Sequence, residues 1–305
     1  MKAFSLLVLN QNGKPIPAIE VDAGTFDLAA VAPGLIKQPE TGLLDILNDW
    51  ETAEKRLIDI AEQINGGRLT ATAMPQPKSD DYDYLVKHPS KMIFAGMNYY
   101  DHLEKDVGVF DFKKDPVDPL FFLKHQGAHA RPGHAISYPQ QTNKFDWEIE
   151  LVVIVGKRGH RVKAAEAMNI VAGYAIGLDL SARDWQFCER HLRKFDLFGG
   201  KAFDDSSPVG PKFVPARFVD PADLPLKLWV NGELKQSSST RQMVWSIGEQ
   251  IEFITQHMAL LPGDMIFTGS PAGVGMPSNT FLKRGDVIEA EIGGLGRLTT
   301  PISER

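Results

Sequence analysis

The sequence predicts a mixed α+β fold that is built mainly from β-strands. Short runs rich in Val, Ile, Leu and Phe, bounded by Gly, Pro, Asn or Asp, recur along the chain, and such runs are typical of strands. Two segments, residues 43–64 and 245–258, instead show the three-to-four-residue apolar spacing of helices. The absence of a regular strand–helix alternation and of an internal repeat argues against a Rossmann fold or a β/α barrel.

Composition sets the class of protein. The 305 residues suffice for one large domain and a small one, and 43% hydrophobic with 24% charged residues is typical of a globular chain. A net charge of −6 argues against a nucleic-acid partner, which requires a basic surface. The single cysteine, Cys188, excludes an internal disulfide. No apolar run approaches the roughly 18 residues of a membrane helix, so we expect a cytoplasmic protein without a membrane partner.

Residues 1–64 are predicted to form a small N-terminal α/β domain. Strands are expected at residues 4–9 and 17–21, separated by a turn at residues 10–13, and the helix that follows should end at Gly66-Gly67. Residues 65–89, which contain Pro75, Pro77 and an acidic run, are predicted to be a linker. The catalytic domain is therefore expected to span residues 90–305.

The large domain is predicted to contain strands, one long helix and a loop. The loop covers residues 107–119, which are rich in Gly, Asp, Lys and Pro, and residues 293–296 are predicted to be a hairpin turn. The expected strands are residues 92–95, 121–123, 149–155, 171–178, 226–230 and 287–292.

The stretch from Lys144 to Gly156 carries the first chemical signal. Side chains alternate along a strand, so Glu148 and Glu150 share a face with apolar residues that follow them. Burying unpaired carboxylates costs several kcal/mol, and a metal ion offsets that cost because two acids at i and i+2 present four oxygens to one point. The alternative is the solvated entrance to a strand, with Asp146, Glu148 and Glu150 facing water.

Three further segments contain candidate site residues. Asp179 follows an apolar strand, where both sites and turns are common. Lys201 follows two glycines and is either an anchoring cation or an ordinary surface lysine. The glycine-rich segment containing Gly269 and Ser270 offers backbone N–H groups to an anion, although it matches neither a phosphate loop nor a nucleophile elbow. A tight turn between strands is the alternative there.

Five motifs occur in one order from about residue 92 to the C-terminus. They are Gly96…Asn98-Tyr99…Asp101-His102, Asp146-Trp147-Glu148-Ile149-Glu150-Leu151, Gly173-Tyr174…Asp179-Leu180-Ser181-Ala182-Arg183-Asp184, Gly200-Lys201…Phe203-Asp204, and Thr268-Gly269-Ser270-Pro271-Ala272-Gly273-Val274-Gly275. This ordered set resembles the fumarylacetoacetate hydrolase family, in particular its acylpyruvate hydrolase and 2-hydroxyhepta-2,4-diene-1,7-dioate isomerase group. The resemblance implies a mixed β-roll or sandwich around a central site, and a homodimer.

The resemblance also implies roles for individual residues. One Mg²⁺ or Mn²⁺ per subunit would be held by Glu148, Glu150 and Asp179, and hard oxygen ligands suit both ions. His102 matches a catalytic histidine whose acid partner usually follows at the third position. Lys105 stands there in this chain, so Glu104 is predicted as the partner, with Asp106 as its rival. The remaining matches are the catalytic Lys201 and the substrate-binding residues Arg183, Gln186, Ser270 and Gly269.

The function expected from this resemblance is hydrolysis of a carbon–carbon bond in a β-diketo acid. The substrate would be an acylpyruvate or a fumarylacetoacetate- or fumarylpyruvate-like keto acid from the catabolism of aromatic compounds, with His102 activating water. Isomerisation, decarboxylation or lyase cleavage of a related keto acid is the alternative, because all pass through an enolate. A non-catalytic family member is a further alternative. A basic cluster, Arg190, His191, Arg193 and Lys194, is either a solvated helix face or an attractant for a dianionic substrate.

Overall fold

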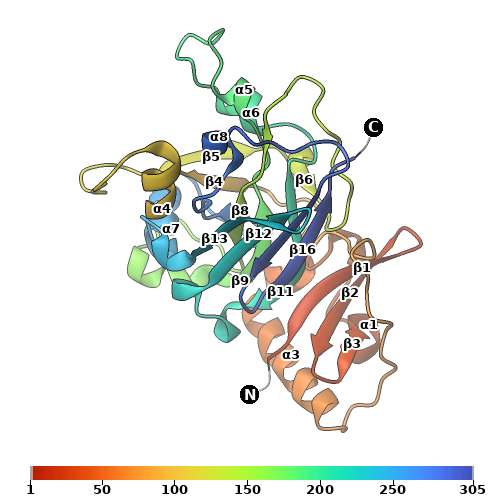
Figure 1. Ribbon diagram of the computed structural model, residues 1–305. Helices are drawn as coiled ribbons and strands as arrows, with labels where there is room; N and C mark the ends of the chain where they lie inside the picture. Colours follow the sequence, from red (N-terminus) through yellow and green to blue (C-terminus); the bar gives the residue numbers. More distant parts are fainter. Residues whose placement is uncertain (1–2, 304–305) are drawn as a thin grey trace.

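A computed structural model describes residues 3–303 of the chain. Its centre is a ten-stranded mixed sheet in the order β3-β2-β1-β11-β9-β8-β14-β4-β5, with β6 pairing alongside β11 (Figure 1). The strands of this sheet are β1 (Ser5–Gln11), β2 (Lys14–Val21), β3 (Gly24–Asp27), β4 (Met92–Gly96), β5 (Leu120–Lys124), β6 (His129–Ala130), β8 (Ile149–Val155), β9 (Val171–Leu178), β11 (Ser207–Pro215) and β14 (Met265–Phe267).

A second, four-stranded antiparallel sheet packs on one face of the first. Its order is β13-β12-β15-β16, and tight hairpins join β12 to β13 and β15 to β16. Asn231 and Gly232 both have positive φ, as a two-residue hairpin turn between β12 and β13 requires. The predicted turn at residues 293–296 joins β15 to β16. The bounds are β12 (Pro225–Val230), β13 (Glu233–Ser239), β15 (Val287–Ile292) and β16 (Gly296–Pro301); β7 (Phe145–Asp146) and β10 (Ser181–Ala182) form a separate pair.

Strand alternation gives the central sheet two apolar faces. Leu151 and Val153 point into the core shared with the four-stranded sheet and with helix α7 (Ile247–His257). Val152 and Ile154 point to the opposite core, which is covered by α2 (Leu44–Asn48) and α3 (Trp50–Asn65). Both faces of β8 are thus buried, which explains its unbroken apolar run from Leu151 to Val155. The other helices are α1 (Leu28–Val31), α4 (Tyr100–His102), α5 (Arg183–Gln186), α6 (Leu197–Lys201) and α8 (Gly275–Ser278).

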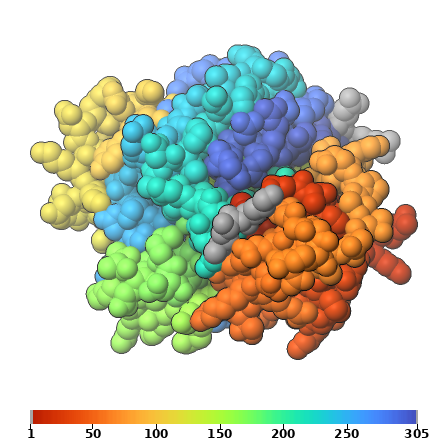
Figure 2. Space-filling model, turned by 90° about the horizontal axis from the view of Figure 1, so that it is seen from below, coloured from red at the N-terminus to blue at the C-terminus, as the bar shows by residue number. Residues whose placement is uncertain are grey.

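The N-terminal segment is joined to the rest of the chain through the sheet. Strand β1 pairs antiparallel with β11, so β1–β3 extend the central sheet at one edge. Figure 2 shows this segment, in red and orange, packed directly against the blue C-terminal strands. The predicted helix is split at Asp49 into α2 and α3, and α3 ends at Gly66 as expected. The domain boundaries at residues 64 and 89 stay a prediction.

Helix α3 contributes to stability through its buried face. Leu57 is fully buried against the central sheet, whereas Lys55 on the opposite face is exposed. We expect Leu57→Ala to lower the free energy of unfolding by about 2–5 kcal/mol, because the truncation leaves a cavity. The matched exposed variant, Lys55→Ala, should change it by less than about 0.5 kcal/mol. Urea titration of both variants is the measurement, and equal effects would contradict this packing.

Strand β11 is the longest of the strands that the sequence did not predict. It contains Pro208, Pro211 and Pro215, and proline inside a run argues against a central strand because it cannot donate to the ladder. The structure accommodates Pro211 where the pairing with β9 is irregular, between Gly210 and Val214, while Pro208 pairs with β6 and Pro215 is the last residue of the strand. Burial of both faces then outweighs the propensity of the sequence.

Candidate active site

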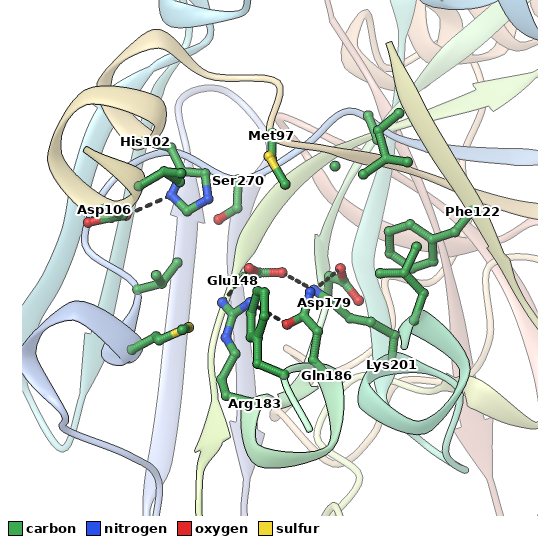
Figure 3. A pocket seen from close by; sticks show the side chains of 18 of the residues that line it. Met97, His102, Asp106, Phe122, Glu148, Asp179, Arg183, Gln186, Lys201 and Ser270 are labelled. Atoms are coloured by element: carbon green, nitrogen blue, oxygen red, sulfur yellow. Dashed lines mark hydrogen bonds and ion pairs between the residues drawn. The ribbon is translucent and has the colours of Figure 1, made fainter. Parts of the chain in front are cut away.

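A cavity of about 300 Å³ lies at the ends of β4, β5, β8 and β9 and beneath the turns that carry α4 to α6. Figure 3 shows that charged side chains gather at its centre, with His102 on one side and Phe122 on the other. The cavity is lined by nine residues that the sequence singled out, namely His102, Asp106, Glu148, Glu150, Asp179, Arg183, Gln186, Lys201 and Ser270. Most of the predicted site residues are thus brought together.

The three carboxylates expected to bind a metal converge because of strand pairing. Glu148 and Glu150 lie on one face of the β8 segment, and the backbone N–H of Asp179 donates to the Glu148 carbonyl at 2.9 Å across the ladder. One carboxylate oxygen from each residue lies within 4.8 Å of the other two. All three side chains are buried, so the alternative of a solvated strand entrance is excluded.

Three buried cations surround these carboxylates. Lys201 Nζ lies 2.5 Å from Asp179 Oδ2 and also pairs with Glu148. Lys124, the last residue of β5, pairs with the other carboxylate oxygen of Asp179, and its Nζ lies 2.6 Å from Oδ1. Arg183 donates from Nε to Asp146 at 2.8 Å and from Nη2 to Glu148 at 2.5 Å. These ion pairs offset the cost of burying several charges together.

Close helix packing brings Arg183 and Lys201 to the same place. A Cβ at Gly200 would lie 2.4 Å from the Gln186 Cβ, so only glycine allows α6 to approach α5 this closely. The side chain of Asp196 caps α6 by accepting from the N–H groups of Phe198 and Gly199. Gln186 in turn accepts a hydrogen bond from Arg183 Nη1 at 2.9 Å, which leaves its amide N–H₂ as a donor.

The surrounding charges shift the pKa values of these groups in opposite directions. Burial alone would raise the pKa of Glu148, but Arg183 and Lys201 outweigh burial and lower it. Burial, Asp179 and Glu148 raise the pKa of Glu150 well above its usual range. Burial also lowers the pKa of Lys124 to about 8, although Asp179 opposes that shift. Glu150 is therefore the carboxylate that lacks a compensating cation.

The donor set fits a hard divalent cation. It consists of carboxylate oxygens, which Mg²⁺ and Mn²⁺ prefer, with no thiolate or imidazole among the three converging residues. The need for positive charge at Glu150 is an independent indication, because a cation placed between the three carboxylates would relieve its burial. Glu148, Glu150 and Asp179 are thus the residues able to hold the metal.

His102 pairs with Asp106, and the prediction of Glu104 as its partner is wrong. His102 Nδ1 lies 2.7 Å from Asp106 Oδ2, whereas Glu104 is exposed to solvent. The reason is helical geometry, since α4 continues into a π-helical turn, Leu103–Val107, that places residues i and i+4 on one face. A carboxylate facing Nδ1–H orients the imidazole and leaves Nε2 as the base.

The glycine-rich segment after β14 donates backbone hydrogen bonds to carboxylates on both sides of the cavity. The N–H of Gly269 donates to Glu150 Oε2 at 2.7 Å, and the N–H of Gly273 donates to Asp106 Oδ2 at 3.0 Å. Gly269 has φ +97, and a Cβ there would meet the Asn98 Cβ at 2.8 Å. Ser270 lines the cavity and accepts from Gln236 Nε2 at 2.9 Å, so its own O–H is free to donate. Gly269 thus acts here through its backbone, on Glu150.

Two buried site residues were missed or under-used by sequence reasoning. Lys124 ends an apolar run, and a lysine directly after a predicted buried strand was the available signal. Asp146 accepts from Arg183, from Gly275 N–H at 2.6 Å and from Met276 N–H at 3.2 Å, so it anchors the arginine and the turn into α8. It adjoins the metal carboxylates in sequence but lies outside the cavity lining.

The His102–Asp106 pair gives a direct comparison of two acids on one turn. Asp106→Asn should lower kcat by about 10-fold or more, because the amide no longer favours the proton on Nδ1 and no longer stabilises the imidazolium. Glu104→Gln removes the same charge from an exposed position and should leave kcat within about twofold. Steady-state kinetics of both variants decide the matter; a larger loss for Glu104→Gln would restore Glu104 as the partner.

Comparison with known proteins agrees with this geometry. The model of the fumarylacetoacetate (FAA) hydrolase C-terminal domain matches residues 91–303. The chain belongs to the fumarylacetoacetate hydrolase family. Over 267 residues it is 40% identical to the mitochondrial oxaloacetate tautomerase FAHD2B of Bos taurus, covering 84% of this chain and 82% of that protein. The rat mitochondrial oxaloacetate tautomerase is 36% identical, covering 90% of this chain and 83% of its own.

Solved structures of the family share the fold. The fumarylacetoacetate hydrolase of Exiguobacterium antarcticum aligns with a TM-score of 0.79 at 27% identity, covering 99% of this chain and 100% of its own. The fumarylpyruvate hydrolase of Pseudomonas aeruginosa, solved with Mn²⁺ and pyruvate, aligns with a TM-score of 0.62 at 33% identity, covering 70% and 90%. The predicted α+β fold of this family is confirmed. Among the described residues, no helix is long and apolar enough to cross a membrane.

Proposed function

We propose that this protein catalyses the keto–enol tautomerisation of a 2-oxo acid. The observation that carries the proposal is a single proton-transfer pair, His102 with Asp106, lining the same cavity as the carboxylate–lysine cluster. Tautomerisation needs one group that moves a proton between carbon and oxygen and a cationic surface for the oxygen. The relatives named oxaloacetate tautomerases, at 36–40% identity, support this reaction type.

Different residues of the chain move the proton and stabilise the developing negative charge. His102 takes the proton from C3 of the 2-oxo acid and returns it to the C2 oxygen, while Asp106 stabilises the imidazolium formed in between. Lys201 has three N–H donors, two of which meet Glu148 and Asp179, so one is available to the oxygen on which negative charge develops. Glu148, Glu150 and Asp179 would hold a Mg²⁺ or Mn²⁺, which when bound would supply Lewis-acid polarisation of the carbonyl.

Ser270 and Gln186 are placed to orient the substrate's carboxylate. Each has a free donor, the hydroxyl of Ser270 and the amide N–H₂ of Gln186, and both line the cavity. Arg183 was predicted to bind substrate directly. Three of its five N–H groups already serve Asp146, Glu148 and Gln186, so we assign it mainly to holding Glu148.

Hydrolysis of a carbon–carbon bond, the function first expected from the sequence, is the second candidate. The same His102–Asp106 pair can activate water, and the fumarylpyruvate hydrolase of Pseudomonas aeruginosa shares the fold at 33% identity. Hydrolysis demands more of the site, because water must occupy the cavity together with the substrate. A role in the catabolism of aromatic compounds belongs to this second candidate.

A substrate panel separates the two candidates. Freshly prepared enol forms of 2-oxo acids, with Mn²⁺, should lose their enol absorbance without change in composition if the protein is a tautomerase. Acetylpyruvate and fumarylpyruvate should be cleaved into two acids if it is a hydrolase, which chromatography of the products detects. Cleavage faster than tautomerisation would overturn the first proposal. The homodimer and the cytoplasmic location stay predictions.

A further inference from the structure

Beyond the charged cluster, the His102–Asp106 pair, Gln186 and Ser270, the lining of the cavity is apolar. Two segments provide about half of this apolar lining, residues 187–197, which run from the end of α5 into α6, and residues 274–277, which run into α8. Phe187 and Met276 remain 44% and 42% exposed, which is high for large apolar side chains that face a cavity. The two segments contribute Phe187, Phe195, Leu197, Val274, Met276 and Pro277, and the rest of the apolar lining is Ala95, Gly96, Met97, Val107, Leu120 and Phe122.

The permanent cations of the cavity are committed to its carboxylates. Of the described residues that line it, only Arg183 and Lys201 carry a permanent positive charge. Arg183 is bound to Asp146 and Glu148, and Lys201 to Glu148 and Asp179. Neither is therefore free to move toward the apolar lining without breaking a buried ion pair.

The net charge of the metal-loaded cluster can be balanced by one substrate carboxylate. Within the cluster around the three converging carboxylates, four buried carboxylates face three buried cations, so a divalent metal leaves one positive charge for one carboxylate of a bound acid. A second substrate carboxylate would lie uncompensated beside apolar side chains, which is costly, and Asp106, the further acid of the lining, adds no positive charge there. The carboxylates are Asp146, Glu148, Glu150 and Asp179, and the cations Lys124, Arg183 and Lys201.

The basic cluster at residues 190–194 does not supply the missing charge. Its residues lie on a loop and not on a helix face, and they do not belong to the cavity lining. Arg190 stacks over the ring of Trp185 at 4.8 Å, and Lys194 pairs with Glu189 at 2.7 Å. The segment instead contributes the rings of Phe187 and Phe195 to the cavity.

We propose that the preferred substrate is a 2-oxo acid with one carboxylate and an apolar substituent, and that the apolar lining selects against dicarboxylic acids. The proposal rests on the proposed function for the placement of the 2-oxo acid head at the charged cluster. It goes beyond that function by naming the class of the tail. Met276, at the exposed rim, is a specificity-determining residue.

Two unreactive ligands of equal shape test the choice of tail. N-isobutyloxamate and N-(carboxymethyl)oxamate share the oxamate head, and their tails differ in that one is apolar and the other is a carboxylate. Titration calorimetry of the Mn²⁺-loaded protein should show the isobutyl compound binding at least about tenfold more tightly. Equal affinities, or tighter binding of the dicarboxylate, would overturn the proposal.

A matched pair of variants locates the selection. Met276→Arg places a cation beside the apolar lining and should shift the affinity ratio toward the dicarboxylate by about tenfold or more. Met168→Arg introduces the same charge at a methionine that is also 42% exposed but does not line the cavity, and should leave the ratio unchanged. An unchanged ratio in a folded Met276→Arg protein would contradict the role of Met276.

Turnover separates this proposal from the proposed function. The enol forms of phenylpyruvate and oxaloacetate should both be ketonised, with a kcat/KM that favours phenylpyruvate by about tenfold. A strong preference for oxaloacetate would overturn the choice of tail and leave the tautomerase function intact. Ketonisation of neither acid would overturn the function, while the binding comparison of the oxamates still decides the class of tail.

Discussion

Replacing His102 with alanine is expected to lower kcat for tautomerisation by about 10²–10⁴, the usual contribution of a positioned general base. The loss should fall on kcat, because the carboxylates proposed to hold the metal and the head of the substrate are on other elements. Mn²⁺ affinity should stay within about twofold of the wild type. Stopped-flow loss of enol absorbance, together with a Mn²⁺ titration, measures both quantities.

A second histidine provides the control for this experiment. His125 is half-exposed and does not line the cavity, so His125→Ala should leave kcat and metal affinity unchanged. A His102→Ala protein that retains full activity would show that another group moves the proton, and Lys201 would be the first to test.

The second large effect is expected at Glu150. Glu150→Ala removes one of three converging carboxylates and should weaken Mn²⁺ binding by more than about 100-fold, since loss even of an outer-shell partner costs 10- to 100-fold. Activity should fall at least in proportion. Because burial and its acidic neighbours raise the pKa of Glu150, protons compete with the metal there, and Mn²⁺ affinity in the wild type should decrease as pH falls.

Glu150→Ala should weaken metal binding but should not lower the thermal stability of the metal-free protein. This combination of effects is diagnostic of the role of Glu150. In metal-free protein the charged form of Glu150 opposes folding, since a raised folded-state pKa contributes stability only while the group is protonated. Metal-free Glu150→Ala should thus unfold at the same or a higher temperature than wild type at neutral pH, and added Mn²⁺ should no longer raise it. Glu166→Ala, an exposed carboxylate, is the control. A metal-dependent stabilisation equal to that of the wild type would contradict the assignment.

The parts of the site that follow strand geometry were predictable from the sequence. Alternation along residues 148–154 placed Glu148 and Glu150 on one face, and the apolar run before Asp179 placed it at a strand exit. The helices α3 and α7 and the hairpin turns followed from periodicity and glycine in the same way. These features are local, so a single stretch of sequence contains the information.

The parts that depend on three-dimensional packing were not predictable. The choice between Glu104 and Asp106 required the pitch of the turn after His102, which becomes π-helical over Leu103–Val107. Lys124 became significant only because β5 lies beside the elements that carry Asp179. Strand β11 was concealed by its prolines, whose cost is offset by burial on both faces.

The carboxylates of the cavity and its base are supported by different kinds of structure. Glu150 belongs to a central strand of the sheet, with Glu148 beside it at the strand's entrance, whereas His102 and Asp106 lie on an irregular turn at the edge of the cavity. Substitutions in that turn can alter proton transfer while the sheet continues to position the carboxylates. A lineage can therefore inherit the cation-binding half unchanged and acquire new reactions through the turn alone. We expect such modular inheritance in a fold whose members include proteins named hydrolase, isomerase and tautomerase.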